Sequence, residues 1–177
     1  MAERIEDVLS QLDSWYNELP GGTERPKMLS KLATLELCGW LEERFDAIAA
    51  GIAQHAGVQA ARTVIERIER TYGFHYSDHL RAIFLAIGGE LLVLRVETAF
   101  QSKYPGELDR LQSTLGVLWK QRCELAHASS VASSGKQLSV NAPSWSINQQ
   151  RILEKLISKF ESELRAAVDG SSHTTAP

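Results

Sequence analysis

Residues 79–100 read HLRAIFLAIGGELLVLRVETAF, and this stretch decides the fold class. Its apolar side chains occur at almost every angle of a helical wheel instead of along one stripe. A helix that is apolar nearly all round must be covered, so the segment belongs in the centre of a helical bundle or in a subunit interface. Gly88, Gly89 and Glu90 interrupt the apolar run, which is therefore too short and too broken to span a bilayer.

The rest of the chain shows the same helical character on both sides of this segment. Apolar residues recur at helical spacing, and glycine or proline turns separate the segments that carry them. The predicted helices cover residues 3–18, 26–52, 58–70, 79–100, 107–127 and 146–168. Because no stretch alternates like a strand and none reads as a repeat or linker, we predict an all-α fold, an antiparallel bundle of five or six helices. Residues 1–169 would form one helical domain, and residues 170–177 a disordered tail.

One region without periodicity lies before the last predicted helix. Residues 128–145 are small and polar, which predicts a long surface loop. Ser146 and Gln149 have the spacing of a capping box, so we expect the last helix to begin at Ser146.

The overall composition restricts the function classes that need consideration. The 177 residues carry a formal charge of −3, with 44% hydrophobic and 23% charged residues, so the surface is not a basic coat for nucleic acid. Binding to nucleic acid would need a local positive patch, which two subunits could assemble together. Cys38 and Cys123 lack metal-ligand spacing and are expected to be reduced thiols in or near the core. The charged, amphipathic start of the chain is not a signal peptide, which predicts a soluble cytoplasmic protein without a membrane partner.

The segment Trp119–His127, WKQRCELAH, carries the most specific chemistry in the chain. Arg122 stays protonated at any working pH and can hold a phosphate through two parallel hydrogen bonds. His127 can give or take a proton near neutrality. Five helical steps place these two positions about 140° apart around one helix axis. They would converge only if the helix unwinds before His127, or if a symmetric partner brings its own copy of the motif alongside.

This arrangement resembles the HEPN superfamily. Gln121–His127, at the end of the penultimate long helix and before a polar loop and a last amphipathic helix, is similar to the motif of the small prokaryotic RiboL-PSP-type HEPN nucleases. Leu37–Glu42 resembles the segment where these families often carry an acidic residue, and Ala142–Ser144 fits the approach to the last helix. The resemblance covers roughly residues 28–168. Many active members carry Asn, Asp or His directly after the motif arginine, whereas this chain has Cys123, and a thiol is a poor orienting group.

The resemblance implies a metal-independent endoribonuclease that acts as a homodimer, with two copies of the motif facing one another. His127 would deprotonate the ribose 2′-hydroxyl or protonate the departing 5′-oxygen, and Arg122 would hold the scissile phosphate. Glu42 would orient one of them, with Glu124 as a weaker candidate for the same role. The phosphate contacts expected along or just before the same helix are Lys120, Arg110 and Lys103.

This family implies no cofactor and no metal. The leading hypothesis is a toxin or antiviral defence effector, for which a cognate antitoxin or a defence-system partner is expected. The alternative is a non-catalytic HEPN-like module that binds a partner protein or a nucleotide. Two further residue groups stay open: Trp119 as a base-stacking platform or as packing, and His75, Asp78 and His79 as a metal-like cluster or as ordinary helix-start residues.

Overall fold

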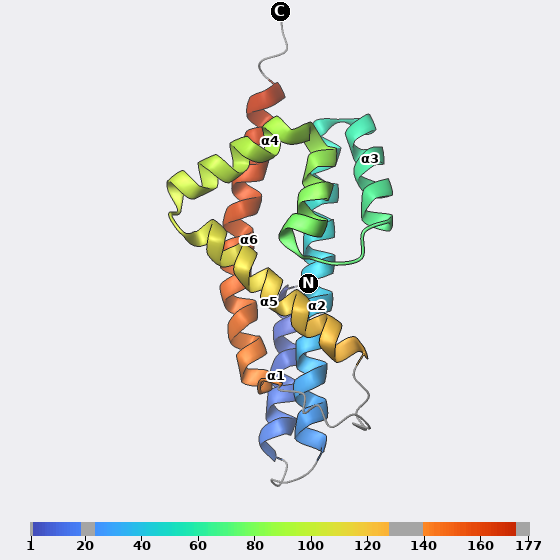
Figure 1. Ribbon diagram of the computed structural model, residues 1–177, viewed down its shortest axis with the longest axis vertical. Coiled ribbons are helices and arrows are strands. Elements are labelled where there is room, and N and C mark those ends of the chain that lie inside the picture. Colours follow the sequence, from blue (N-terminus) through green and yellow to red (C-terminus); the bar gives the residue numbers. More distant parts are fainter. Residues whose placement is uncertain (1, 19–23, 128–139, 173–177) are drawn as a thin grey trace, which may run out of the picture. The chain divides into compact units, whose positions relative to one another are not determined.

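The computed structural model describes residues 2–18, 24–127 and 140–172. Within these ranges the chain is helical, without a strand, so the prediction of an all-α helical bundle is confirmed (Figure 1). The elements are α1 (Ala2–Glu18), α2 (Arg25–Ala56), α3 (Val58–Glu69), the π-helical turn η1 (Tyr76–Leu80), α4 (Arg81–Lys103), α5 (Glu107–His127) and α6 (Pro143–Ser172). Among these described helices, none is both long enough and apolar enough to cross a membrane.

The described residues group into two compact units. Of the described residues, the first unit comprises 2–18, 24–41, 117–127 and 140–153, and the second comprises 42–116 and 154–172. Helices α2, α5 and α6 each contribute residues to both units. The motif positions Arg122 and His127 belong to the first unit, and Glu42 belongs to the second.

The first unit has an aliphatic core with polar contacts at its edge. Its buried apolar side chains include Ile5, Leu9, Leu12, Leu37, Cys38, Trp40, Leu41, Leu118, Leu125 and Leu153. Arg151 Nε donates a hydrogen bond to Glu6 Oε1 at 2.9 Å, which joins α6 to α1. The Cys38 thiol lies 3.9 Å from the carbonyl oxygen of Leu118, so α2 and α5 are in contact within this unit.

The second unit is built around aromatic rings. The ring centroids of Phe84 and Phe100 lie 5.4 and 5.7 Å from that of Phe160, and Tyr76 meets Phe160 edge-on at 6.1 Å. The Tyr76 hydroxyl donates to Glu97 Oε1 at 2.9 Å. Burial, followed by the charge of the Glu97 carboxylate, raises the pKa of this phenol far above its ordinary value, so Tyr76 stays neutral and holds η1 against α4.

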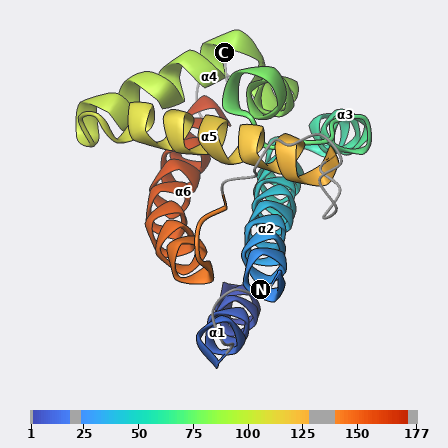
Figure 2. The same cartoon turned by 60° about the horizontal axis from the view of Figure 1, so that its bottom comes forward.

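Helix α4 differs from the continuous helix predicted over residues 79–100. Gly88 (φ −154°, ψ 18°) and Gly89 (φ 74°, ψ −174°) leave helical geometry and divide α4 into two halves that run in different directions (Figure 1). Figure 2 shows the same bend, with the first half seen nearly along its axis and the second from the side. The Gly89 conformation is open only to glycine, and a Cβ atom at Gly88 would lie 2.6 Å from a methyl group of Leu92.

The two halves of α4 are joined again by charged side chains. The Arg81 guanidinium, in the first half, pairs with Glu90 directly after the break and lies 3.6 Å from Glu97. Two large apolar side chains after the break are exposed, Leu91 at 79% and Leu94 at 46%. The apolar run therefore forms two helical segments that meet at a backbone break, instead of one fully covered central rod.

The last helix begins earlier than predicted. Trp145 N–H donates to the carbonyl oxygen of Ala142 at 2.9 Å, and α6 starts at Pro143, which suits a first helical turn. Ser146 is fully buried inside the helix, so the predicted capping box with Gln149 is wrong. Helix α6 continues to Ser172, and the rest of the predicted tail, residues 173–177, lies outside the described residues, as does most of the predicted loop, residues 128–139.

Candidate functional site

The candidate site lies on the last two turns of α5. The helix starts after the turn Tyr104–Gly106, where Glu107 N–H donates to the Tyr104 carbonyl at 3.0 Å, and it ends at His127 as predicted. Because α5 stays helical to His127, it does not unwind between the two motif positions. Arg122 and His127 therefore remain about 140° apart around the axis, and the first of the two routes to convergence is excluded. The side chain of His127 itself lies outside the described part of the chain.

Arg122 is partly buried and contacts an aromatic ring. Its guanidinium carbon lies 5.1 Å from the centroid of the Trp119 ring, a cation–π contact between residues three positions apart on α5. Trp119 is also partly buried. From the sequence, Trp119 is a base-stacking platform or a packing residue; the i, i+3 spacing permits this contact with Arg122 but does not fix it.

The other motif residues differ in exposure. Lys120 and Glu124 are exposed, and Cys123 is a partly buried free thiol, whereas Cys38 is a buried one. Lys120 can therefore reach a solvent-borne phosphate from this surface. Cys123 takes the place directly after Arg122 without offering a strong hydrogen-bonding group.

The second unit contains three of the predicted site residues, Glu42, Lys103 and Arg110. That they act together with Arg122 stays a prediction. Arg110 is exposed on the first half of α5. The ammonium of Lys103 lies 2.7 Å from Glu163 Oε1 and 5.4 Å from the centroid of the Tyr104 ring. The hydrogen bond to Glu163 raises the pKa of Lys103 above its ordinary value. The positive charge of Lys103 is therefore already paired with Glu163 inside this unit, which argues against Lys103 as a phosphate ligand.

Glu42 has an acidic neighbour that sequence reasoning missed. Asp46 follows it by one helical turn on α2, and the side chains of both residues are partly buried. Burial, and then the nearby charge of Glu42, raise the pKa of Asp46 to about 6. The i, i+4 spacing of two acids was visible in the sequence, but the burial that shifts the pKa was not.

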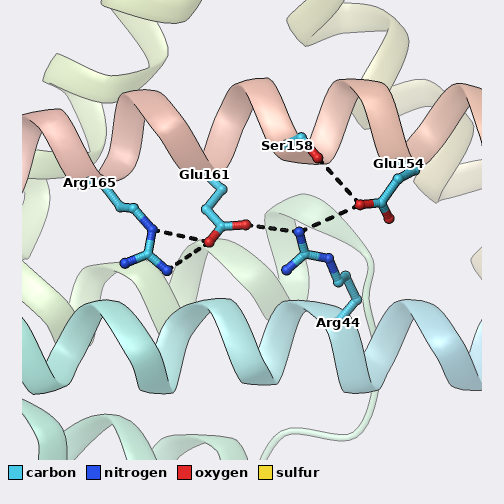
Figure 3. A network of polar contacts seen from close by, with 5 residues as sticks. All are labelled: Arg44, Glu154, Ser158, Glu161 and Arg165. Atoms are coloured by element: carbon cyan, nitrogen blue, oxygen red, sulfur yellow. Dashed lines mark hydrogen bonds and ion pairs between the residues drawn. The ribbon is translucent and has the colours of Figure 1, made fainter. Parts of the chain in front are cut away.

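A second charged group lies between α2 and α6, and every member has a partner (Figure 3). Glu161 accepts hydrogen bonds from Arg44 at 2.9 Å and from Arg165 at 2.7 Å. Arg44 also lies 3.6 Å from Glu154, whose Oε1 accepts a 3.3 Å hydrogen bond from Ser158. Burial alone would raise the pKa of Glu161, but the two arginines together outweigh it and lower that pKa. The alternating charges make this network a structural link and not an anion site.

The metal-like residues next to η1 form a close polar contact and a ring contact. His75 Nδ1 lies 3.0 Å from Asp78 Oδ2, and the rings of His75 and His79 meet edge-on with centroids 6.4 Å apart. His75 precedes η1, and its Nε2 would lie 3.5 Å from a Cβ atom at Gly116, so the imidazole packs against α5. In the described ranges, no three His, Cys, Asp or Glu side chains are arranged to hold a metal ion.

The first unit also has an open apolar groove of about 510 Å³. Its lining residues are Trp15, Glu18, Arg25, Met28 and Leu29. Trp15 is 48% exposed and Met28 is 56% exposed, which is unusual for side chains of this size.

No known protein-family model, curated protein or solved structure matches this chain.

Proposed function

We propose that this chain is a metal-independent endoribonuclease of the HEPN type that acts as a homodimer. The single observation that supports it best is the state of Arg122. This side chain is partly buried, its guanidinium carbon lies 5.1 Å from the centroid of the Trp119 ring, and it belongs to a helix that runs unbroken to His127. A restrained cation and an imidazole at one helix end are the two groups that phosphodiester cleavage without a metal requires.

The chemistry follows from the residue types. The 2′-oxygen of the ribose attacks the phosphorus, its proton passes to an imidazole, and the bond from phosphorus to the 5′-oxygen breaks. A proton is delivered to that leaving oxygen, and the products are a 2′,3′-cyclic phosphate and a free 5′-hydroxyl. Arg122 holds the phosphate and stabilises the charge that builds on its oxygens. DNA lacks the 2′-hydroxyl nucleophile and is not cleaved.

A dimer is part of the proposal because one copy of α5 does not bring Arg122 and His127 together. We infer that Arg122 of one copy and His127 of the second face the same phosphate. Such an enzyme would act as a toxin or a defence effector, with an antitoxin or a system partner that restrains it.

A cleavage assay in EDTA tests the activity. We expect the wild-type protein to cleave a generic RNA and to leave its 2′-deoxy counterpart intact. His127→Ala and Arg122→Ala should each lower the rate by about 100-fold or more. The matched controls are His55→Ala and Arg62→Ala, which replace exposed residues of the second unit and should retain full activity. Equal cleavage by wild type and His127→Ala, or no cleavage by either, would contradict the proposal.

Subunit mixing tests the shared site. If each site takes Arg122 from one copy and His127 from the other, a mixture of the two inactive variants contains heterodimers with one intact site. Roughly a quarter of the wild-type rate should then return on mixing, since about half of the dimers are mixed and half of their sites are intact. Sedimentation as a monomer at micromolar concentration, or no recovery on mixing, would contradict a shared site.

One observation favours a second function, a non-catalytic module that binds a partner protein. The groove lined by Trp15 and Met28 exposes large apolar side chains, a feature of protein-binding surfaces. In that case Arg122 would serve packing through Trp119. Arg122→Ala would then lower the melting temperature, while a catalytic Arg122 tolerates removal with little change in melting.

A further inference from the structure

The open groove of the first unit is lined by apolar side chains from two helices. On α2, Met28, Leu29 and Leu32 follow one another at helical spacing along one side, and Met28 and Leu32 are 56% and 41% exposed. On α1, Trp15 is 48% exposed and lines the same groove. Large apolar side chains grouped on a surface in this way are typical of a protein–protein interface.

Two opposite charges also line this groove. Glu18 is the last residue of α1 and Arg25 is the first residue of α2, and the side chains of both are exposed. Glu18 accepts a 2.9 Å hydrogen bond from the Ser14 hydroxyl. Within the described ranges no carboxylate pairs with Arg25. The groove therefore presents an acid on one helix and a base on the other.

Each of these two charges lies at the helix end that disfavours it. The C-terminal end of a helix carries a partial negative charge and the N-terminal end a partial positive charge. The last turn of α1 nevertheless contains Glu18 and no basic residue, and the first turn of α2 contains Arg25 and no acidic residue. Neither charge stabilises its own helix, so a role in binding accounts for these positions better than helix stability does.

We infer that this groove binds the same groove of a second copy of the chain. In an interface with two-fold symmetry, Glu18 of one copy faces Arg25 of the other, and the same pair occurs a second time. A surface with one acid and one base is thus complementary to itself, whereas a patch of a single charge sign suits an unlike partner. Trp15 and Met28 fill the apolar centre between the two pairs. This inference rests on the homodimer of the proposed function and names its interface.

Charge reversal and subunit mixing test the pairing, with sedimentation velocity at micromolar concentration as the readout. Glu18→Arg and Arg25→Glu should each weaken dimerisation about tenfold or more, because each places like charges opposite one another. Both changes suit the dipoles of their helices, so circular dichroism should show an unchanged helix content. In an equal mixture of the two variants, every mixed dimer regains two pairs of opposite charge, and dimerisation should return to the wild-type level.

Met28→Lys tests the apolar centre of the same interface. The substitution puts a charge into the groove and should weaken dimerisation about tenfold. Ile65→Lys is the matched control, because Ile65 is 48% exposed on α3 of the second unit. This control should dimerise like the wild type.

The outcomes separate the interface from the proposed nuclease. A wild-type dimer that none of the three groove variants weakens is joined through another surface, which overturns the inference and leaves the nuclease intact. Weakened reversal variants that do not recover on mixing also overturn it. A dimer that responds as expected but does not cleave RNA supports the interface and overturns the nuclease. A wild-type protein that sediments as a monomer overturns both the interface and the shared site.

Discussion

Asp46 provides the sharpest test of the electrostatics, through the substitution Asp46→Asn. Burial and the neighbouring Glu42 carboxylate raise its pKa from 3.8 to about 6. The difference corresponds to at most ~3 kcal/mol, at roughly 1.4 kcal/mol per pKa unit. Because the side chain is only partly buried, solvent screening reduces the expected effect to about 1 kcal/mol.

The direction of the pH dependence follows from proton binding. Between about pH 4 and pH 6, the folded chain retains a proton on Asp46 that the unfolded chain has released. The contribution of this carboxyl to stability is therefore complete below about pH 4 and is lost as the pH rises through 6. An asparagine carries no charge at either pH, so the substitution removes the cost of ionisation at neutral pH.

We expect Asp46→Asn to be about 1 kcal/mol more stable than wild type at pH 7.5, and to melt about 3 °C higher. At pH 4 the difference should nearly vanish. The assay is urea unfolding followed by circular dichroism at both pH values. Glu43→Gln is the matched control, because Glu43 is the exposed acid three residues earlier on the same helix, and it should leave stability nearly unchanged. A variant that is no more stable at pH 7.5, or whose advantage persists on acidification, would refute the assignment.

The same unfolding assay tests three other features of the fold. Gly89→Ala should cost about 1–2 kcal/mol, because its φ of 74° and ψ of −174° exclude an L-residue; Gly39→Ala, inside α2 with open space around the new Cβ, should instead stabilise by about 0.5–1 kcal/mol. Glu161→Gln should lose roughly 1–2 kcal/mol at pH 7, and this loss should shrink as the pH falls below 4.5, since arginines hold the pKa of Glu161 low and that stabilisation disappears as the carboxylate is protonated. Phe160→Ala removes a ring that meets three others and should cost about 3–5 kcal/mol. Equal stability of the two glycine variants, a pH-independent loss at Glu161, or a loss below about 1 kcal/mol at Phe160 would contradict the corresponding account.

Helix positions were predictable where local signals act alone. The helix 107–127 was predicted with the observed bounds, because a proline–glycine turn precedes it and its apolar spacing is regular. The last helix was predicted to begin at Ser146, because Ser146 and Gln149 have the spacing of a capping box. In the structure it begins at Pro143, and Ser146 is buried inside the helix. Pro143 was the better signal, since proline suits a first helical turn.

The break at Gly88 and Gly89 could not be located from periodicity. The Gly–Gly pair itself is a signal for a turn or kink, but apolar residues on all sides give no stripe whose direction could change. In the structure the bend is accompanied by the pairing of Arg81 with Glu90 and Glu97, contacts that a straight-helix pattern does not contain. The residue types of the candidate site were readable in the sequence, whereas the contact of Arg122 with Trp119 depends on side-chain geometry.

The divided form of α4 also determines how force passes along the chain. A continuous helix is a stiff rod, and displacement at one end moves the other. Here two residues without side chains interrupt the rod, so movement of η1 reaches the turn before α5 through side-chain contacts: the rings that pack on Phe160, and the charges of Arg81 and its two glutamates. Added salt screens such charges, so the mechanical coupling between these two ends of the second unit should soften as ionic strength rises.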